Sequence, residues 1–236
     1  MKNKEKLQEE EYIFPYHHTI IKEKYSGISY FSIIKIIKEI LKKINSKELL
    51  DFGCGDGKLI YELKNSKIKL TGIDTSKKAI GFAKAFSPRI EFVSKDINEY
   101  TPSSKFDTIT SIEVLEHINP SELKNIITII HNLLKKNGHF IITVPSDNIP
   151  TSKKHYQHFN INSMKKELNE KFKILETIGH YKKSRIYEIL YALSINNYIS
   201  ITSKHYQKFL NFYFKKKLEK SNLSQCRRLI FICKKI

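Results

Sequence analysis

One stretch decides the fold of this chain: Leu49-Leu50-Asp51-Phe52-Gly53-Cys54-Gly55-Asp56-Gly57. A hydrophobic run ends in an acid, glycines then alternate with other residues, and a helical pattern follows over 58–64. Glycine suits such a turn because it adopts positive φ at little cost and lets a ligand approach the backbone closely. The start of the helix offers unpaired N–H groups to that ligand. The stretch therefore predicts a strand, a tight ligand-binding turn and a helix.

Two further strand ends carry acids. The segment 69–74 is predicted to form a second strand that ends in Asp74. Asp74 follows Gly53 by about 21 residues. In nucleotide-binding βαβ units an acid at that distance binds ribose hydroxyls. A third short strand over 90–93 leads to Asp96-Ile97. These features together predict a nucleoside-binding edge on a parallel sheet.

The rest of the chain continues the alternation of strand and helix. Thr75-Ser76 is a suitable N-cap for a helix, and Asn137-Gly138 is a typical helix stop. Short turns between alternating strands and helices predict a doubly wound α/β fold with a parallel sheet. The predicted helices cover 30–44, 58–64, 77–86, 120 to about 136, 162 to about 170 and much of 184–220, and the predicted strands cover 48–52, 69–74, 90–93, 106–112, 139–144, 172–178 and 228–233.

The acid before the glycine turn, the acid ending the second strand and the later Asp-Ile pair together resemble the class I S-adenosylmethionine-dependent methyltransferases. The resemblance covers about residues 45–180. It implies a Rossmann-like seven-stranded sheet of order 3-2-1-4-5-7-6, with the last strand antiparallel between the fifth and sixth. The 45 or so residues between the predicted sixth and last strands exceed the short segment usual in the family, so a helical insertion is expected there.

The resemblance also assigns a cofactor site for S-adenosylmethionine. Asp74 is expected to bind the ribose hydroxyls, Asp96 the adenine amino group and Asp51 the methionine end. Ile97 would offer a backbone N–H and an apolar contact, and the glycines would let the cofactor approach the backbone. The full set of expected cofactor-binding residues is Asp51, Gly53, Gly55, Asp74, Thr75, Asp96, Ile97, Ile112 and Glu113.

Histidines are the candidate catalytic residues, because a hydroxyl acceptor must lose a proton and histidine titrates near neutrality. His117 follows the fourth predicted strand, and His155 and His158 lie in the loop after the fifth. Each has an alternative as a packing or solvent-exposed residue. Glu116 either orients His117 or is a helix-start acid that favours the helix dipole.

A divalent metal site is an alternative use of the same residues. Carboxylates and imidazoles at Glu113, Glu116 and His117, joined by His155 or His158, form a plausible oxygen and nitrogen site. The small-RNA terminal 2′-O-methyltransferases carry a comparable Glu-x-x-Glu-His, although their later histidine motif is only loosely matched here. We expect no metal, and we keep a metal-dependent RNA 2′-O-methyltransferase and a non-catalytic cofactor-binding regulator as alternatives.

Composition limits the compartment and the partners. The 236 residues carry 42 basic and 24 acidic side chains, a net charge of +18, which suits nucleic acid, anionic membranes or phosphate-bearing substrates. Lysine dominates over arginine, however, which is typical of AT-rich codon usage, whereas specific nucleic-acid recognition favours arginine. The polar N-terminus and the lack of a long apolar run predict a cytoplasmic protein. The cysteines form no CxxC pair.

We expect a single methyltransferase domain over 1–236: an N-terminal lid and helix (1–45), a cofactor-binding core (46–180), a helical insertion (181–225) and the last strand (226–236). Tyr12, Tyr16 and His17 are candidate lid contacts over the cofactor. The insertion is rich in Tyr, Ile and Phe and ends in lysines, so it either covers the acceptor pocket, touches a membrane or forms a dimer contact. The predicted reaction is O-methylation of a small-molecule, glycan or lipid-linked acceptor. The acceptor and the oligomeric state cannot be read from the sequence.

Overall fold

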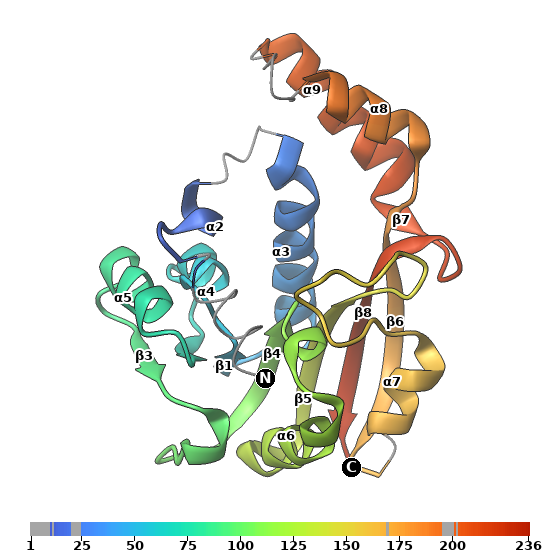
Figure 1. Ribbon diagram of the computed structural model, residues 1–236. Coiled ribbons are helices and arrows are strands. Elements are labelled where there is room, and N and C mark those ends of the chain that lie inside the picture. The colour runs from blue at the N-terminus through green and yellow to red at the C-terminus, as the bar shows by residue number, and fades with distance from the viewer. Residues whose placement is uncertain (1–9, 11, 20–24, 169, 195–200, 202) are drawn as a thin grey trace.

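The computed structural model describes residues 10, 12–19, 25–168, 170–194, 201 and 203–236 (Figure 1). Parts of the predicted lid, and Ile195, Tyr198 and Ile199 of the predicted insertion, lie outside these described residues. In chain order the elements are α2 Tyr16–Thr19, α3 Tyr25–Lys43, β1 Glu48–Phe52, α4 Lys58–Leu63, β2 Lys69–Asp74, α5 Lys77–Phe86, β3 Glu91–Ser94, η1 Ile97–Glu99, β4 Phe106–Ile112, η2 Leu115–His117, α6 Pro120–Leu133, β5 Leu134–Pro145, α7 Ile161–Leu168, β6 Phe172–Lys182, α8 Arg185–Ser194, α9 Lys204–Tyr213, η3 Phe214–Leu218, β7 Lys220–Ser221 and β8 Cys226–Lys235.

The strands form one sheet of order β3-β2-β1-β4-β5-β8-β6-β7. Strands β3, β2, β1, β4 and β5 pair in parallel, and β8 runs antiparallel to both β5 and β6. The predicted doubly wound Rossmann-like sheet is therefore confirmed, with the last long strand between the fifth and sixth. A two-residue strand, β7, is added at the edge beyond β6.

Strand alternation supplies a hydrophobic core on each face of the sheet. Side chains of β1, β5 and β8 point alternately to the two sides: Leu50, Ile142 and Phe231 join one buried cluster with α6 and α7. Leu49, Ile141 and Ile232 join a second cluster with α3, α4 and α5. Helices thus cover both faces, because these strands bury apolar side chains on both sides of the sheet.

Several element ends differ from the prediction, and two of the differences have a clear local reason. Helix α6 ends at Leu133 rather than near residue 136, and Asn137-Gly138 lies within β5, where the pairing with β4 is irregular and Asn137 has a φ of 61°. The predicted helix stop is therefore a strand irregularity. Helix α7 begins at Ile161, before the predicted start at 162, because Asn160 caps it: the Asn160 Oδ1 accepts the Ser163 N–H at 2.8 Å.

The insertion packs on the N-terminal part of α3. Tyr187 of α8, Leu210 of α9 and Phe214 and Leu218 of η3 form a third buried cluster with Ile28 of α3. Ser32 of α3 donates a hydrogen bond at 2.7 Å to Oε1 of Glu219, next to η3. Within the described residues, none of the helices has the length and apolar content needed to cross a membrane.

Candidate active site

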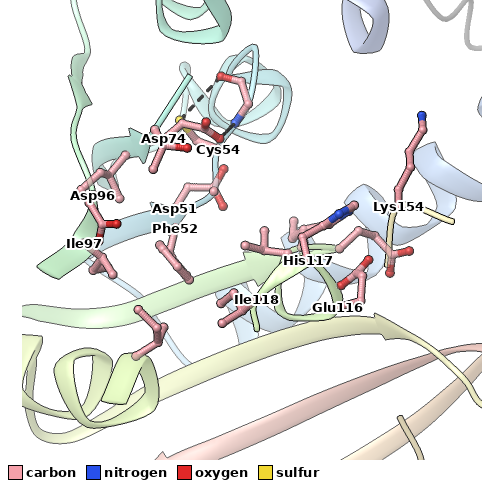
Figure 2. Close-up of a pocket in the computed structure, with 18 of the residues that line it drawn as sticks. Asp51, Phe52, Cys54, Asp74, Asp96, Ile97, Glu116, His117, Ile118 and Lys154 are labelled. Atoms are coloured by element: carbon pink, nitrogen blue, oxygen red, sulfur yellow. Dashed lines mark hydrogen bonds between the residues drawn. The ribbon is translucent and has the colours of Figure 1, made fainter. Parts of the chain in front are cut away.

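A cavity of about 370 Å³ opens where the parallel strands end. Figure 2 shows Asp51, Asp74 and Asp96 toward one end and Glu116, His117 and Lys154 toward the other. This position, outside the carboxyl ends of β1, β2 and β4, is where open α/β sheets bind their ligands. The residues expected to bind cofactor all line it: Asp51, Gly53, Gly55, Asp74, Thr75, Asp96, Ile97, Ile112 and Glu113.

The glycine turn is held by Asp74. Its Oδ2 accepts the Gly55 N–H and its Oδ1 accepts the Ser76 N–H, both at 2.9 Å. Ser76 in turn caps α5, because its Oγ accepts the Ala79 N–H at 3.1 Å. Asp74 is therefore a structural brace of the turn as well as a candidate ribose ligand. A carboxylate has about four acceptor sites, so one carboxylate can accept a ribose hydroxyl as well as backbone N–H groups.

Asp96 lines the same end of the cavity as Asp51 and Asp74 (Figure 2). Its Oδ1 accepts the Asn98 N–H at 2.8 Å, which caps the turn η1 and leaves the side chain exposed at the cavity. Ile97, the first residue of η1, is buried beneath it. The pair thus presents a carboxylate beside an apolar surface, a combination that suits an adenine ring and its amino group.

Replacing Asp74 with asparagine is expected to weaken binding of S-adenosylhomocysteine by about 1.5–3 kcal/mol, the scale of hydrogen bonds to a charged group. Isothermal calorimetry measures the affinity, and thermal melting without ligand reports any loosening of the turn. Asp107→Asn is the matched control, because Asp107 also accepts backbone N–H groups, those of Lys47 and Glu48, and is not among the residues that line the cavity. Unchanged affinity in Asp74→Asn would remove Asp74 from the ribose role.

Asp51 is buried in β1, where its negative charge is poorly solvated. Its Oδ1 accepts the Thr110 hydroxyl at 2.7 Å. Burial raises the pKa of Asp51 from 3.8 to about 7, the Thr110 hydrogen bond lowers it, and the nearby Asp74 charge raises it further. An ionised Asp51 is thus destabilising in the absence of a cation, such as the ammonium group of a methionine moiety.

Asp51→Asn is expected to stabilise the protein at pH 8 by up to about 4 kcal/mol, since one pKa unit corresponds to 1.36 kcal/mol. The folded state holds the Asp51 proton more tightly than the unfolded state, so wild-type stability falls as pH rises from about 4 to about 7. The gain should vanish near pH 4. Urea denaturation of both proteins across this range measures the difference, and a gain independent of pH would contradict the assignment.

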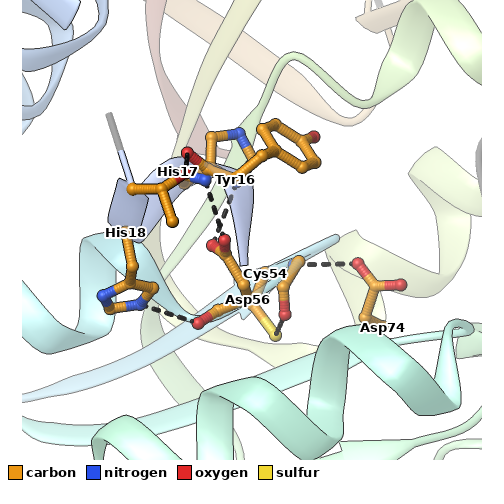
Figure 3. A network of polar contacts seen from close by, with 8 residues as sticks. Tyr16, His17, His18, Cys54, Asp56 and Asp74 are labelled. Atoms are coloured by element: carbon orange, nitrogen blue, oxygen red, sulfur yellow. Dashed lines mark hydrogen bonds and ion pairs between the residues drawn. The ribbon is translucent and has the colours of Figure 1, made fainter. Parts of the chain in front are cut away.

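A strap formed by residues 12–19 crosses the glycine turn. Asp56 anchors it: Oδ2 accepts the His17 N–H at 2.9 Å, Oδ1 contacts His17 Nδ1 at 3.0 Å, and the Asp56 carbonyl accepts from His18 Nε2 at 3.0 Å (Figure 3). Tyr12 is buried, and a Cβ on Gly55 would lie 2.5 Å from its hydroxyl. Tyr12, Tyr16 and His17 line the cavity, as a lid would.

The end of the cavity opposite Asp51, Asp74 and Asp96 is built from η2 and the loop after β5. The Tyr156 N–H donates to the Glu116 carbonyl at 2.8 Å, which brings the loop against η2. The rings of His117 and His155 then lie 4.7 Å apart, edge to face. Both histidines line the cavity, whereas His158 is not among its lining residues and lies behind His155.

A chain of hydrogen bonds sets the tautomer of His155. A carbonyl only accepts, so the 3.1 Å contact between His158 Nδ1 and the Ile149 carbonyl places a proton on His158 Nδ1. In the tautomer of His158 that carries its proton on Nδ1, Nε2 accepts the His155 Nδ1–H, at 2.8 Å. The lone pair of neutral His155 is thereby on Nε2. Burial, with help from His117, His158 and Arg228, lowers the pKa of His155 to about 4, so this form persists at neutral pH.

Two carboxyl groups beside these histidines differ in their partners. Glu113 has a φ of 55°, accepts the Thr143 hydroxyl at 3.1 Å and pairs with Arg228 Nε at 2.5 Å. Glu116 is buried, and its Oε2 has no hydrogen-bond partner among the described residues. Burial raises the pKa of Glu116 well above its usual range, and the charge of Glu113 adds to the shift. Burial therefore favours the neutral form of the Glu116 carboxyl, and a cation beside it would favour the charged form.

Sequence reasoning missed Asp56 and Arg228. Asp56 stands within the glycine turn, so its position was visible but its partners, which lie in the strap, were not. Arg228 reaches the cavity only because β8 pairs with β5 in a register that sets it opposite Pro145. No motif in the last strand signals that placement.

Comparison with known proteins agrees with this geometry. The profile of a family described as "Methyltransferase domain" matches residues 27–223. An uncharacterized methyltransferase from Synechocystis is 32% identical over 98 residues, which cover 41% of this chain and 46% of that protein. A ubiquinone biosynthesis O-methyltransferase from Rickettsia bellii is 24% identical over 182 residues, which cover 75% of this chain and 61% of that protein. The chain thus covers less than two thirds of the length of either relative.

Solved structures share the fold. Magnesium protoporphyrin IX methyltransferase from Synechocystis with bound S-adenosylmethionine superposes with a TM-score of 0.59 at 17% identity, covering 89% of this chain and 81% of that chain. An S-adenosylmethionine-dependent methyltransferase from Archaeoglobus fulgidus gives a TM-score of 0.59 at 17% identity, covering 85% of this chain and 94% of that chain. The family profile spans most of this chain and the predicted resemblance is confirmed, so the chain belongs to the methyltransferase domain family and, within it, to the class I S-adenosylmethionine-dependent methyltransferases.

Proposed function

We propose that this protein transfers a methyl group from S-adenosylmethionine to an oxygen atom of a small-molecule, glycan or lipid-linked acceptor. The observation that carries the proposal is the hydrogen-bonded chain from the Ile149 carbonyl through His158 to His155. It holds an unprotonated imidazole nitrogen at the end of the cavity opposite the nucleoside-binding acids.

The residues present fit the cofactor. Gly53 and Gly55 have φ values of 72° and 53°, so the turn is a concave cradle that other residues rarely form. Asp74 and Asp96 would bind the ribose and adenine, and the buried Asp51 carboxylate would meet the ammonium of the methionine moiety. When bound, S-adenosylmethionine supplies an electrophilic methyl group on a good leaving group. The chain then has to align the acceptor and, for a hydroxyl, take its proton.

His155 is the proton acceptor in this proposal. Its Nε2 accepts the proton of the acceptor hydroxyl, and its Nδ1–H stays bound to His158, so the ring does not rotate as it becomes charged. His117 stands beside it and contributes to the shape of the acceptor site. The carbonyl of Ile149, through His158, offsets part of the burial that lowers the pKa of His155, and it does not itself change protonation.

An oxygen acceptor is favoured over nitrogen for a chemical reason. A neutral amine is already a nucleophile, whereas a hydroxyl needs a base as the carbon–oxygen bond forms. The printed name of the Rickettsia bellii relative, an O-methyltransferase, supports the same choice.

A labelled-methyl acceptor screen tests the proposal. The full chain is first shown to bind S-adenosylhomocysteine by calorimetry, then incubated with labelled S-adenosylmethionine and pools of phenols, glycans and lipid extracts. The expected product carries an O-methyl group, identified by mass spectrometry. Label found only on nitrogen or carbon would overturn the oxygen assignment, and binding without any transfer would favour a regulator.

A divalent metal is the second candidate, and a specific observation favours it. Ligand atoms of Glu116, His117 and His155 all lie within 4.8 Å of one another, and the unpartnered Glu116 Oε2 is buried among them. The His155 Nε2 lone pair suits a metal ligand whose other ring nitrogen is held by His158. Glu113 is instead engaged by Arg228 and Thr143, so the two-carboxylate pattern of the RNA 2′-O-methyltransferases is not reproduced.

Glu116→Gln separates the two candidates. Glutamine copies the shape and neutrality of a protonated glutamic acid, so with His155 as the base we expect turnover within about threefold of wild type, with or without chelator. With metal as the cofactor, the loss of an anionic ligand would reduce metal affinity about 10–100-fold or more, as even outer-shell changes do. Calorimetric titration of magnesium, manganese and zinc into both proteins gives a second readout. Loss of activity in chelator, restored by one of these ions, would establish the metal candidate.

A further inference from the structure

Helices α8 and α9 expose large apolar side chains on one side each. In α8, Ile186, Ile189 and Leu193 are 62%, 60% and 58% exposed, and at about 100° per residue they fall within roughly 60° of the helix circumference. In α9, Phe209 and Phe212 are 48% and 62% exposed. We call these five residues the apolar tip. Single exposed apolar residues are ordinary, but two helical stripes on consecutive helices indicate an interaction surface.

The inward faces of the same helices are already used. Tyr187 of α8 and Leu210 of α9 are buried against Ile28 of α3. The Tyr206 hydroxyl donates to the Leu190 carbonyl at 2.9 Å, which ties α9 to α8. The helices are therefore anchored to the domain by one side and to each other, and the apolar tip is the side that this packing leaves outward.

The charge around the apolar tip is almost entirely positive. From residue 182 to 220 the acids are Glu188 and Glu219; Glu188 pairs with Arg227, and Glu219 accepts from Ser32. The same range carries nine exposed basic side chains: Lys182, Lys183, Arg185, Lys204, Lys208, Lys215, Lys216, Lys217 and Lys220. A surface that combines aliphatic and aromatic side chains with lysines matches the interface of an anionic bilayer.

The apolar tip also lies at the edge of the sheet where the cavity opens. Because β6 and β5 both run antiparallel to β8, they run in the same direction, and α8 begins shortly after β6 ends. Figure 1 shows α8 and α9 extending beyond that edge. Ile13 and Phe14 of the strap, next to Tyr12 over the glycine turn, are 77% and 52% exposed. Exposed apolar side chains therefore occur both in the strap, whose Tyr12 lines the cavity, and in the helices that follow β6.

We propose that the apolar tip docks the protein on anionic phospholipid bilayers, with Ile186, Ile189, Leu193, Phe209 and Phe212 in the interfacial layer and the surrounding lysines on the headgroups. A second copy of this chain is disfavoured because the flanking lysines would face each other. Nucleic acid is disfavoured because Ile and Leu gain nothing from phosphates or stacked bases. Docking is independent of whether His155 or a metal performs the chemistry.

Vesicle flotation of the full chain tests this docking. The vesicles are phosphatidylcholine alone and phosphatidylcholine mixed with phosphatidylglycerol. Binding is expected to the anionic vesicles and to persist partly in high salt, because apolar insertion is not screened. Ile189→Ser/Phe212→Ser should weaken it at least about tenfold, and Lys215→Gln/Lys216→Gln/Lys217→Gln should weaken it by about two orders of magnitude at low salt. Leu175→Ser is the matched control, since Leu175 is 48% exposed but lies near the opposite end of β6.

A fluorescence reporter makes the result independent of those variants. The chain has no tryptophan, so Phe212→Trp introduces a single one, and its emission should shift to the blue on anionic vesicles. Leu175→Trp should not shift. Absence of binding at low salt, or equal binding by Ile189→Ser/Phe212→Ser and wild type, would overturn the proposal. Self-association that light scattering detects in the wild type and not in this double variant would also overturn it. A gel shift with single-stranded RNA, in a protein that does not bind vesicles, would overturn it as well.

Discussion

Replacing His155 with alanine is expected to lower kcat by about 10²–10⁴-fold, the usual contribution of a general base. The affinity for S-adenosylhomocysteine should hold, because the His155 ring lies 4.7 Å from that of His117. His117 is at the end of the cavity opposite the three acids Asp51, Asp74 and Asp96 (Figure 2). Single-turnover methyl transfer to the acceptor found in the screen measures kcat, and calorimetry measures the affinity. An intact kcat would leave His155 without a catalytic role.

Two comparison variants sharpen this result. His158→Ala removes the group that holds the His155 Nδ1–H, so it should lower kcat less than His155→Ala and leave KM for the acceptor nearly unchanged. His131→Ala is the matched control, because His131 contacts the Ile236 carbonyl and is not among the residues that line the cavity. If His131→Ala and His155→Ala reduced kcat equally, the loss would come from folding rather than from proton removal.

The fold was largely predictable because its signals are local. The acid and glycines of 51–57, the strand ending at Asp74 and the Ser76 cap all act within a few residues of one another, and the structure reproduces them. Successive side chains of a central strand point to opposite faces of the sheet, so neighbouring residues also decide which side chains enter each core. The predicted helix stop at Asn137-Gly138 is the exception. A residue with positive φ followed by glycine is as suitable in a strand irregularity as at a helix end, so this local signal is ambiguous.

The sequence predicted which residues belong to the site, but not the contacts that bring them together. The sequence placed His117 and His155 near the same edge, since both follow neighbouring parallel strands. It could not show that the Tyr156 N–H would bind the Glu116 carbonyl, which is what brings the two rings together. It also could not show that Asp56 would hold the strap or that Arg228 would take Glu113. Each of these contacts joins segments far apart in the chain, and neither periodicity nor motif spacing records them.

Gly55→Arg is expected to abolish measurable binding of S-adenosylhomocysteine. Gly55 lines the cavity at a φ of 53°, so any side chain there is strained and points into the space between the turn and the strap. A left-handed backbone alone costs a non-glycine residue roughly 1–2 kcal/mol. The arginine side chain would in addition occupy the volume that the cofactor needs, and calorimetry would show the loss.

Gly55→Ala tests whether the strap contacts the glycine turn. Its Cβ would lie 2.5 Å from the Tyr12 hydroxyl but 3.4 Å from the Tyr12 Cζ, an ordinary contact distance. Tyr12→Phe therefore removes the clash and leaves only the backbone strain. In the Tyr12→Phe background, Gly55→Ala should lower the free energy of unfolding by about 1–2 kcal/mol, and in the wild-type background by at least about 1 kcal/mol more, a coupling within the range seen for residues in contact.

Urea denaturation of the four proteins in this cycle measures the coupling, and calorimetry with S-adenosylhomocysteine shows whether the strap and the cofactor site move together. If Tyr12 covers the bound cofactor, Gly55→Ala should lose more affinity with Tyr12 present than with phenylalanine, because the displaced hydroxyl pushes the strap off the turn. Equal losses of stability in both backgrounds would mean that Tyr12 does not lie on Gly55 in solution. The Asp56 contacts with His17 and His18 would then hold a strap that leaves the cavity open.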